Sequence, residues 1–569
     1  MKTTVLAALH LHAHLQPEAV ALRGVAESGE ARVVSYAALA KYVDVLACWL
    51  RQQQVPLLGL WGENQIEWVI ADLAAWQAGI PIIPLPRFFS PAQLAFVAAS
   101  SGLRHVLTCG AISDGLPTLR RVSSPVPAIY LDPLTSGLLK STCRPAAKST
   151  PPETCKITFT SGTTGQPKGV CLSSATLDAV TSALAERIHE AEACQAEASQ
   201  AEASQAEASQ AEASDNGLNA HFSLLPLSTL LENVAGIYVP ILLGKTAIVL
   251  PGPSIGLLGS SQLDMPLLLK ALHQQQPNSL IVLPQILAGL VAAVSQGVTL
   301  PRSLRFIAVG GASTPPALLT QAHALGIPVF EGYGLSECAS VVSLNSPRAN
   351  RIGSVGKVLS HLRLRVIGGV VQVAGDVAGD VADQVAGQVA GQVAGQVAGN
   401  IFSGYLGQPS VDAQPQPTWF DTGDIGHIDG QGYLYITGRK KNLLISSFGR
   451  NISPEWLESE LSLRASVAQA MVIGDAQPFC AAVLVARSPA VDAAQLAVDI
   501  AAMNETLPDY AKVRRFIVAT EPFSLANGAL TDNGRLRREV IAARYAAAIA
   551  ALYSPTFQTT ESGALHAIF

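Results

Sequence analysis

The chain has 569 residues, and its 37 Lys and Arg against 42 Asp and Glu give a net charge of −5. This slight excess of acid, without any basic block, argues against a nucleic-acid partner. Eight scattered cysteines without a Cys-x-x-Cys pair exclude a disulfide scaffold and give no zinc-ligand spacing.

Neither the N-terminus nor the apolar segments indicate a membrane protein. The short apolar run at the N-terminus is interrupted at once by His10, His12 and His14, so no signal peptide is predicted. The long apolar stretch 279–298 contains Pro284, which favours a buried strand followed by a helix over a transmembrane segment. We therefore expect a cytoplasmic enzyme, with peripheral membrane contact left open only by the low charged fraction of 14%.

Short apolar runs alternate with helical stretches along the first three quarters of the chain. The expected strands are 57–61, 81–84, 247–250, 279–283 and 306–309, and the expected helices include 68–78 and 265–276. This alternation predicts an α/β fold with mainly parallel sheets. After Gly438 the sequence pattern changes: it indicates short strands at 471–473 and 481–485 and a helix at 536–550, which predicts a small α+β domain. We place the domains at 1–440 and 441–569.

Residues 158–170 contain the strongest chemical signal, a strand-like segment that enters a loop of Gly, Ser and Thr and ends in one lysine. Glycines allow backbone N–H groups to approach an anion, hydroxyls donate further hydrogen bonds, and Lys168 adds positive charge. The loop does not match the GxxxxGK[ST] pattern of a Walker motif. It predicts a phosphate site formed by Thr160, Ser161, Gly162, Thr163, Thr164, Gly165 and Lys168.

Two internal repeats follow. Five pentads of the AEASQ type cover 191–215; their five-residue period forms no apolar stripe, which predicts an exposed helix or a disordered insert. Seven tetrads of the VAGQ type cover 373–400, where a Gly in nearly every turn disfavours a helix and favours an extended hairpin or a mobile loop. We interpret both repeats as tolerated insertions in surface loops of the first domain.

The SGTTGQPKG sequence at 161–169 resembles the signature of the adenylate-forming (AMP-binding) superfamily, and within it the chain most resembles long-chain fatty acyl-CoA synthetases. The likeness extends from about Leu15 to about Tyr545, with further motifs in the family's order. It implies a large, multi-lobed N-terminal domain and a small, mobile C-terminal domain. It also implies ATP, Mg²⁺ and CoA as co-substrates and cofactor.

Two segments match the family's adenine and metal motifs. The turn Gly310-Gly311-Ala312 follows a strand and would let a flat base lie against the backbone. In the segment 331–337 the resemblance implies that Tyr333 stacks on adenine beside Gly334, that Ser336 contacts phosphate, and that Glu337 binds Mg²⁺, a cation that prefers one or two carboxylates plus phosphate oxygens.

Two later segments complete the implied nucleotide site. Asp424, at the end of Trp-Phe-Asp-Thr-Gly-Asp, would accept the ribose hydroxyls, and Arg439 would assist at the ribose or the phosphate. Lys441 stands at the family's hinge position between the two domains. The segment 447–455 resembles the part of the small domain that faces CoA.

Two positions depart from the family pattern. Thr229 stands where a His or an aromatic residue is common, so no role is assigned to it. Arg535 occupies the place of a lysine that contacts the carboxylate and the α-phosphate during adenylation. Arginine keeps the charge and adds donors, although the exchange is not conservative at a tight site. We expect Arg535 to substitute for the lysine, as a catalytic residue together with Lys168 and Glu337.

The leading hypothesis is therefore a ligase that activates a carboxylic acid as acyl-AMP and transfers it to CoA. The only acid in 219–236 is Glu232, a pattern seen in long-chain acyl-CoA synthetases, and 280–294 would either line an apolar acyl tunnel or pack in the core. Both features favour a medium- or long-chain fatty acid over an amino acid. Two alternatives remain, namely a fatty-acyl-AMP ligase that loads an acyl carrier protein, and a non-catalytic nucleotide- or acyl-binding protein.

Overall fold

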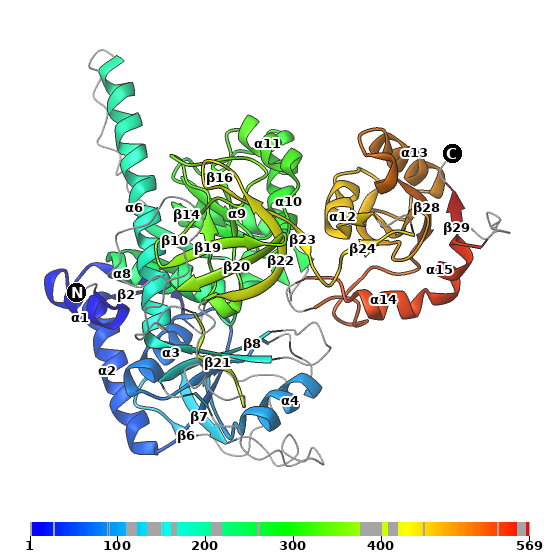
Figure 1. Ribbon diagram of the computed structural model, residues 1–569. Coiled ribbons are helices and arrows are strands. Elements are labelled where there is room, and N and C mark those ends of the chain that lie inside the picture. The colour runs from blue at the N-terminus through cyan, green and yellow to red at the C-terminus, as the bar shows by residue number, and fades with distance from the viewer. Residues whose placement is uncertain are drawn as a thin grey trace, which may run out of the picture.

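A computed structural model shows a large body built on two sheets and a smaller unit beside it (Figure 1). The residues that the structure describes are 3–26, 29–87, 89, 91–109, 122–133, 150–151, 153–160, 168–205, 219–258, 262–375, 401–407, 419–447, 450–531, 534–554 and 565–567. The α/β class expected from the sequence is confirmed, since helices cover sheets that are parallel at their centres and antiparallel at their edges.

The first sheet has nine strands in the order β18-β17-β16-β15-β14-β10-β11-β1-β2. The six strands from β16 to β1 run parallel, while β17, β18 and β2 are antiparallel at the two edges. Their bounds are β18 Lys357–Val358, β17 Ser343–Leu344, β16 Val329–Tyr333, β15 Phe306–Val309, β14 Ser279–Val282, β10 Ala220–Ser223, β11 Thr246–Val249, β1 Val20–Val25 and β2 Ala31–Ser35. The shared direction of the parallel strands brings their carboxyl ends to one edge.

The second sheet has eight strands in the order β21-β9-β8-β4-β3-β5-β7-β6. Strands β8, β4, β3 and β5 are parallel, and the outer pairs are antiparallel. Their bounds are β21 Gly404–Tyr405, β9 Lys168–Ser173, β8 Thr154–Thr160, β4 Ile82–Pro84, β3 Leu58–Trp61, β5 His105–Cys109, β7 Ile129–Pro133 and β6 Val122–Ser123.

The core between these two sheets contains α3 (Ile66–Ala78), whose residues from Ile66 to Trp76 are all buried. One apolar cluster joins side chains of the first sheet, such as Leu22, and of the second, such as Leu60, to this helix. Gly79 ends α3 in the left-handed conformation that glycine adopts without strain. The remaining helices of this body are α1 Val5–Leu15, α2 Tyr36–Gln53, α4 Pro91–Ser101, α6 Ser174–Gln205, α7 Leu230–Asn233, α8 Val239–Leu243, α9 Met265–Gln275, α10 Pro284–Ser295 and α11 Pro316–Ala324.

A third sheet of four antiparallel strands leads toward the smaller unit. It consists of β19 Leu362–Ile367, β20 Val370–Gly375, β22 Phe420–Ile428 and β23 Leu434–Arg439. Two short two-stranded sheets pair β12 Leu257–Leu258 with β13 Gln262–Leu263, and β24 Leu444–Ile445 with β25 Asn451–Ile452.

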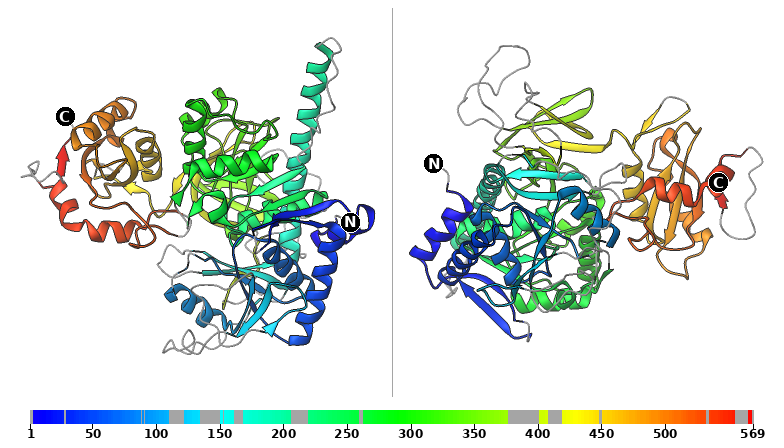
Figure 2. Two further views of the ribbon diagram at one scale, coloured as in Figure 1. Left: turned by 180° about the vertical axis from the view of Figure 1, so that it is seen from behind. Right: turned by 90° about the horizontal axis from the view of Figure 1, so that it is seen from below.

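The smaller unit has its own apolar clusters, one around Phe516 and one around Tyr545, and it forms a separate lobe beside the large body (Figures 1 and 2). Its sheet runs in the order β26-β27-β28-β29, with bounds Val467–Ile473, Cys480–Ala486, Val513–Val518 and Leu565–Ala567. Its helices are α12 Pro454–Ser462, α13 Ala493–Asn504, α14 Arg538–Arg544 and α15 Ala546–Leu552.

The prediction of one helix over 536–550 is wrong in detail. The helical segment begins at Arg538 and is divided at Tyr545, whose backbone leaves the helical range. The Tyr545 side chain is buried in the core of the small unit, and its hydroxyl accepts a hydrogen bond from the backbone N–H of Thr520 at 3.3 Å. This buried contact is non-local, so the helical pattern of the sequence could not indicate the break.

Both repeats are described only in part. The first continues α6 as far as Gln205, in agreement with the helical alternative, and this helix projects from the body (Figure 1). The rest of that repeat lies outside the described residues. Of the second repeat the structure describes 373–375, at the end of β20. In the described part of the chain, no helix combines the length and the apolar composition that crossing a membrane requires.

Candidate active site

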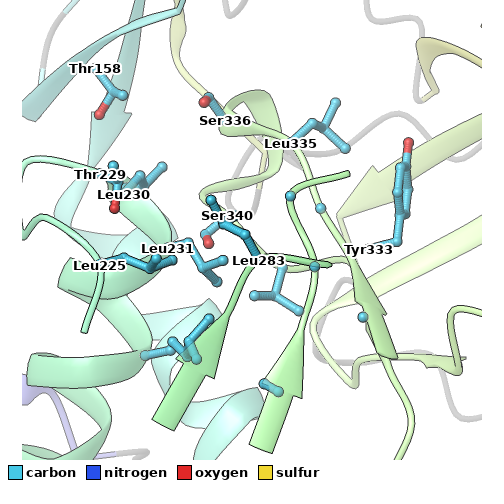
Figure 3. A pocket seen from close by; sticks show the side chains of 18 of the residues that line it. Thr158, Leu225, Thr229, Leu230, Leu231, Leu283, Tyr333, Leu335, Ser336 and Ser340 are labelled. Atoms are coloured by element: carbon cyan, nitrogen blue, oxygen red, sulfur yellow. The ribbon is translucent and has the colours of Figure 1, made fainter. Parts of the chain in front are cut away.

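A cavity of about 890 Å³ opens at the carboxyl ends of β15 and β16 and extends along one face of the first sheet. It is bounded by the first two sheets, by α6 to α8, and by residues around the junction with the smaller unit. Figure 3 shows its two characters: Leu225, Leu231 and Leu283 face one another, whereas the hydroxyls of Thr158 and Ser336 lie toward the other end. Most of the residues predicted from the motifs lie in or beside this cavity.

The two strands that hold the predicted phosphate loop are antiparallel partners. Thr160 at the end of β8 is the register partner of Lys168 at the start of β9. Lys168 lines the cavity, as does Thr158. The other residues of the predicted phosphate site, Ser161, Gly162, Thr163, Thr164 and Gly165, lie outside the described residues, as does the side chain of Thr160.

Lys168 and Glu337 meet at Tyr405, a residue that no motif indicated. The Lys168 Nζ lies 5.2 Å from the centre of the Tyr405 ring, and the Tyr405 hydroxyl donates a hydrogen bond of 2.9 Å to Oε1 of Glu337. Burial and the neighbouring Glu337 carboxylate raise the pKa of Tyr405 above its ordinary value, so it remains a hydrogen-bond donor. Tyr405 reaches this position because β21 pairs with β9.

Two of the three predicted adenine-site residues line the cavity. Gly310 and Gly311 follow β15 directly, and Gly311 has a φ of 81°, which glycine adopts without strain. A Cβ atom at Gly310 would approach the carbonyl oxygen of Gly332 to 3.1 Å, so the backbones of β15 and β16 are close here. Ala312 is exposed and does not line the cavity.

The turn after β16 holds Ser336 and Glu337 at the cavity wall. It depends on Gly334, where a Cβ atom would lie 1.6 Å from the carbonyl oxygen of Ser340. Only glycine allows so close an approach of two backbone segments. The glycine of this motif therefore has a packing role, besides lining the cavity itself.

Asp424 is buried, with 2% of its surface exposed, and both of its oxygens have partners. The Tyr333 hydroxyl donates to Oδ2 at 2.5 Å, and Arg439 donates through Nε to Oδ1 at 2.7 Å. Burial and the adjacent carboxylate raise the pKa of Tyr333 well above its ordinary value. Tyr333 and Arg439 line the cavity, whereas Asp424 lies behind them and its neighbours Thr422 and Gly423 form the wall.

The smaller unit contributes directly to the cavity. Arg535 donates hydrogen bonds to the carbonyl oxygen of Gly311 from Nη2 at 3.1 Å and from Nε at 3.3 Å. These contacts join a residue of the C-terminal motif to the strand end that forms the predicted adenine site. Lys441, the predicted hinge, is exposed and also lines the cavity.

The other half of the cavity has an apolar wall with one polar group of residues. Its apolar side chains include Leu231, Ala235, Ile281 and Phe306. Of the predicted tunnel segment 280–294, residues such as Ile281 line the cavity while others, such as Leu290, pack in the core, so both interpretations hold in part.

The polar group contains His221, Glu232 and Ser279. The Nε2 atom of His221 lies 3.1 Å from Oε1 of Glu232, and its Nδ1 lies 3.0 Å from Oγ of Ser279. Complete burial raises the pKa of Glu232 above its ordinary value. Sequence analysis singled out Glu232 but not its two partners, which no local motif marks.

Comparison with known proteins places these features in a family. The sequence profile described as AMP-binding enzyme matches residues 9–406, and that of the AMP-binding enzyme C-terminal domain matches residues 441–556. The long-chain-fatty-acid–CoA ligase FadD15 of Mycobacterium bovis is 24% identical over 565 aligned residues, which cover 87% of each chain.

Two further relatives act on a different acid. The 2-succinylbenzoate–CoA ligase of Bacillus cereus is 28% identical over 330 residues, 57% of each chain. The O-succinylbenzoate coenzyme A synthetase (MenE) of Bacillus subtilis, solved in complex with ATP and a magnesium ion, has a similar fold with a TM-score of 0.66. It is 22% identical, and the match covers 94% of this chain and 98% of that one.

Proposed function

This chain belongs to the AMP-binding enzyme family, and we propose that it activates an apolar carboxylic acid and transfers it to CoA, as an AMP-forming acyl-CoA ligase does. In the first step the carboxylate oxygen attacks the α-phosphorus of ATP, which gives acyl-AMP and releases pyrophosphate. In the second step the thiol of CoA attacks the acyl carbon, which gives the thioester and releases AMP. The observation that carries this proposal is the cavity, which joins the motif residues of the nucleotide site to an apolar channel.

The nucleotide would lie at the carboxyl ends of β15 and β16. Gly310 and Gly311 offer a flat backbone surface for the adenine, against which Tyr333 would stack. Asp424 has lone pairs that Tyr333 and Arg439 leave unused, because a carboxylate has about four acceptor sites. It would receive the ribose hydroxyls once one of these two covering side chains moves aside, since Asp424 is now 2% exposed behind them. Arg439 would hold that carboxylate in place.

The phosphates would lie beside Lys168 and Ser336, both of which line the cavity. Lys168 supplies positive charge there, and Glu337 is suited to hold Mg²⁺. No group of three or more His, Cys, Asp or Glu that could hold a metal is found among the described residues. A single carboxylate nevertheless fits Mg²⁺, which takes its other ligands from phosphate oxygens and water. When bound, this ion neutralises charge on the phosphates.

Arg535 is our candidate for the group that stabilises charge at the reacting phosphorus. Its contact with Gly311 holds the guanidinium in the cavity at the strand end that forms the predicted adenine site. A cation fixed at this point would interact most strongly when negative charge accumulates in the transition state. We also propose that the domains extend over 1–440 and 441–569, with Lys441 as the hinge that allows the smaller unit to rotate between the two steps.

We infer that the acid is a medium- or long-chain fatty acid. The acyl half of the cavity is lined mainly by leucine, isoleucine and other apolar side chains, as burial of a hydrocarbon chain requires. Among the described residues that line this half, no lysine or arginine faces the channel to bind a second carboxylate. A dicarboxylic acid would therefore lack a charged partner.

The test is mass spectrometry of the products after incubation with ATP, Mg²⁺ and a panel of acids, with and without CoA. The panel contains saturated fatty acids of increasing length, aromatic acids and amino acids. The proposal is supported if acyl-CoA and AMP form with the fatty acids of the panel and with no other acid. Acyl-AMP that does not react with CoA would indicate transfer to a carrier protein, and exclusive activation of amino acids would overturn the assignment of the acid.

A further inference from the structure

The floor of the acyl half of the cavity is one face of the first sheet. His221 of β10 is the register partner of Ser279 of β14, and Ser279 is the partner of Phe306 of β15, so the three side chains form one row across the face. All three line the cavity. The row lies at the beginning of these strands, four residues before Gly310. At 3.3 Å per residue this is about 13 Å from the nucleotide end.

These connected polar side chains thus cross the end of a mainly apolar channel, whose lining also includes the polar residues Thr229, Gln285 and Ser340. His221 and Ser279 are each 8% exposed, and Glu232 behind them is fully buried. The Glu232 carboxylate accepts a hydrogen bond from the backbone N–H of Leu225 at 3.0 Å and faces His221 Nε2 with its other oxygen. Buried polar groups cost free energy unless they are hydrogen-bonded, so this arrangement must satisfy each of its atoms.

Of the side chains in this group that line the cavity, Ser279 has a hydroxyl that can still bond to a ligand. When Glu232 is ionised it accepts from Nε2–H of His221, so Nδ1 accepts from Ser279 and the serine oxygen can still accept hydrogen bonds with its lone pairs. When Glu232 is protonated it donates to Nε2, so Nδ1–H donates to Ser279 and the serine hydroxyl can still donate one bond. A hydroxyl group serves as partner in both cases, because it both donates and accepts.

We propose that the acid taken by this enzyme carries a hydroxyl group on its chain, far from the carboxyl group, and that Ser279 binds this hydroxyl. This inference rests on the proposed function and narrows its substrate class from fatty acids to hydroxy fatty acids. Gly236 supports the arrangement, because a Cβ atom there would lie 2.3 Å from Oε1 of Glu232 and 3.1 Å from Nε2 of His221. The fold thus reserves space for these connected polar side chains beside the channel.

The experiment compares pairs of acids of equal length, with and without a terminal hydroxyl, in a ladder from eight to sixteen carbons. Adenylation is followed as pyrophosphate release in the presence of ATP and Mg²⁺, with wild type, Ser279→Ala and Ser279→Cys. The matched control is Ser100→Ala, whose hydroxyl donates a hydrogen bond to the carbonyl of Val97 within α4 and which does not line the cavity. All variants are also examined by circular dichroism, to verify that they fold.

At one chain length the wild type should prefer the hydroxy acid in kcat/KM, and Ser279→Ala should lower that preference by about threefold to tenfold, the effect of one neutral hydrogen bond. The kcat/KM for the plain acid should fall by a smaller factor than that for the hydroxy acid. The preference of Ser279→Cys for the hydroxy acid should lie between those of the wild type and Ser279→Ala, and the preference of Ser100→Ala should match that of the wild type. Equal activity on both acids at every length, or an equal loss on both in Ser279→Ala, would overturn the inference.

A binding measurement separates this inference from the proposed function. Calorimetric titration of the same acid pairs, without ATP, reports on the channel alone. If no acid is adenylated but the hydroxy acid binds more tightly to wild type than to Ser279→Ala, the proposed function fails and the hydroxyl site stands. If neither member of a pair binds preferentially, the hydroxyl site fails, whatever the outcome of the activity assay.

Discussion

Replacement of Arg535 by alanine tests the C-terminal contribution to the site most directly. The change removes two hydrogen bonds, of 3.1 and 3.3 Å, to the carbonyl oxygen of Gly311, and it removes a positive charge from the cavity. Loss of one preorganised donor that faces developing charge typically lowers a rate by about 10²- to 10³-fold, or about 3–4 kcal/mol. We expect a loss of this size in the adenylation step.

Two half-reactions distinguish this role from a structural one. Pyrophosphate release from ATP and acid reports adenylation, whereas conversion of preformed acyl-AMP with CoA reports thioester formation. Arg535→Ala should reduce the rate of pyrophosphate release by at least 100-fold and change the rate of thioester formation by less than about threefold. Arg535→Lys, which keeps the charge at the position where the family usually has lysine, should retain most of the first activity.

Arg514→Ala is the control, because Arg514 lies in the same unit and forms an exposed ion pair of 2.5 Å with Asp509 away from the cavity. Such exposed pairs contribute little, so this variant should match the wild type in both assays. The reasoning is refuted if Arg535→Ala adenylates its acid at the wild-type rate. It is also refuted if both half-reactions fall equally, since that would indicate a general disturbance of the small unit.

Three further predictions concern stability. Lys156→Met should lower the free energy of unfolding by about 3–5 kcal/mol, measured with urea. The ammonium that lies 2.7 Å from Oδ1 of Asp72 is buried, and its loss leaves a buried carboxylate without its counter-charge. A loss below about 1 kcal/mol would contradict this expectation. Burial raises the pKa of Glu331 from 4.5 to about 8. Between these two pH values the folded protein keeps a proton that the unfolded chain releases. The free energy of unfolding should therefore fall as the pH rises from about 5 to 8. Glu331→Gln should flatten that part of the profile and stabilise the protein at pH 8, and parallel profiles for the two proteins would disprove the assignment. Gly334→Ala should destabilise the protein by about 3 kcal/mol and abolish activity, because the new Cβ atom would overlap the carbonyl of Ser340; an active, stable variant would show that the turn can rearrange.

Much of the nucleotide site could be predicted because its residues lie in short motifs. The strand predicted at 306–309 is β15, and the glycine turn that follows it lies at the cavity as expected. Local hydrophobic patterns determine where a strand ends, and parallel strands of one sheet end at the same edge. The motif residues of β15 and β16 therefore converge without any long-range information beyond the strand order.

The partners of the motif residues were not predictable in the same way. Tyr405 reaches Glu337 only because β21 pairs with β9, more than 230 positions earlier in the chain. Ala312 is exposed and does not line the cavity, so its part in an adenine site stays a prediction. Such placements depend on strand pairing and on packing between sheets, which sequence periodicity does not encode.

By itself the sequence determined the α/β class, the presence of a smaller C-terminal unit and the motifs that predict a phosphate and a metal site, because each depends on residues close together in the chain. Only the tertiary structure decided which distant groups meet. It joined His221 to Ser279, 58 positions apart, by placing β10 beside β14, and it brought Arg535 to Gly311 by docking the small unit against the large body. These contacts exist because side chains from separate segments are buried together, and burial is a property of the packed fold and not of any one segment.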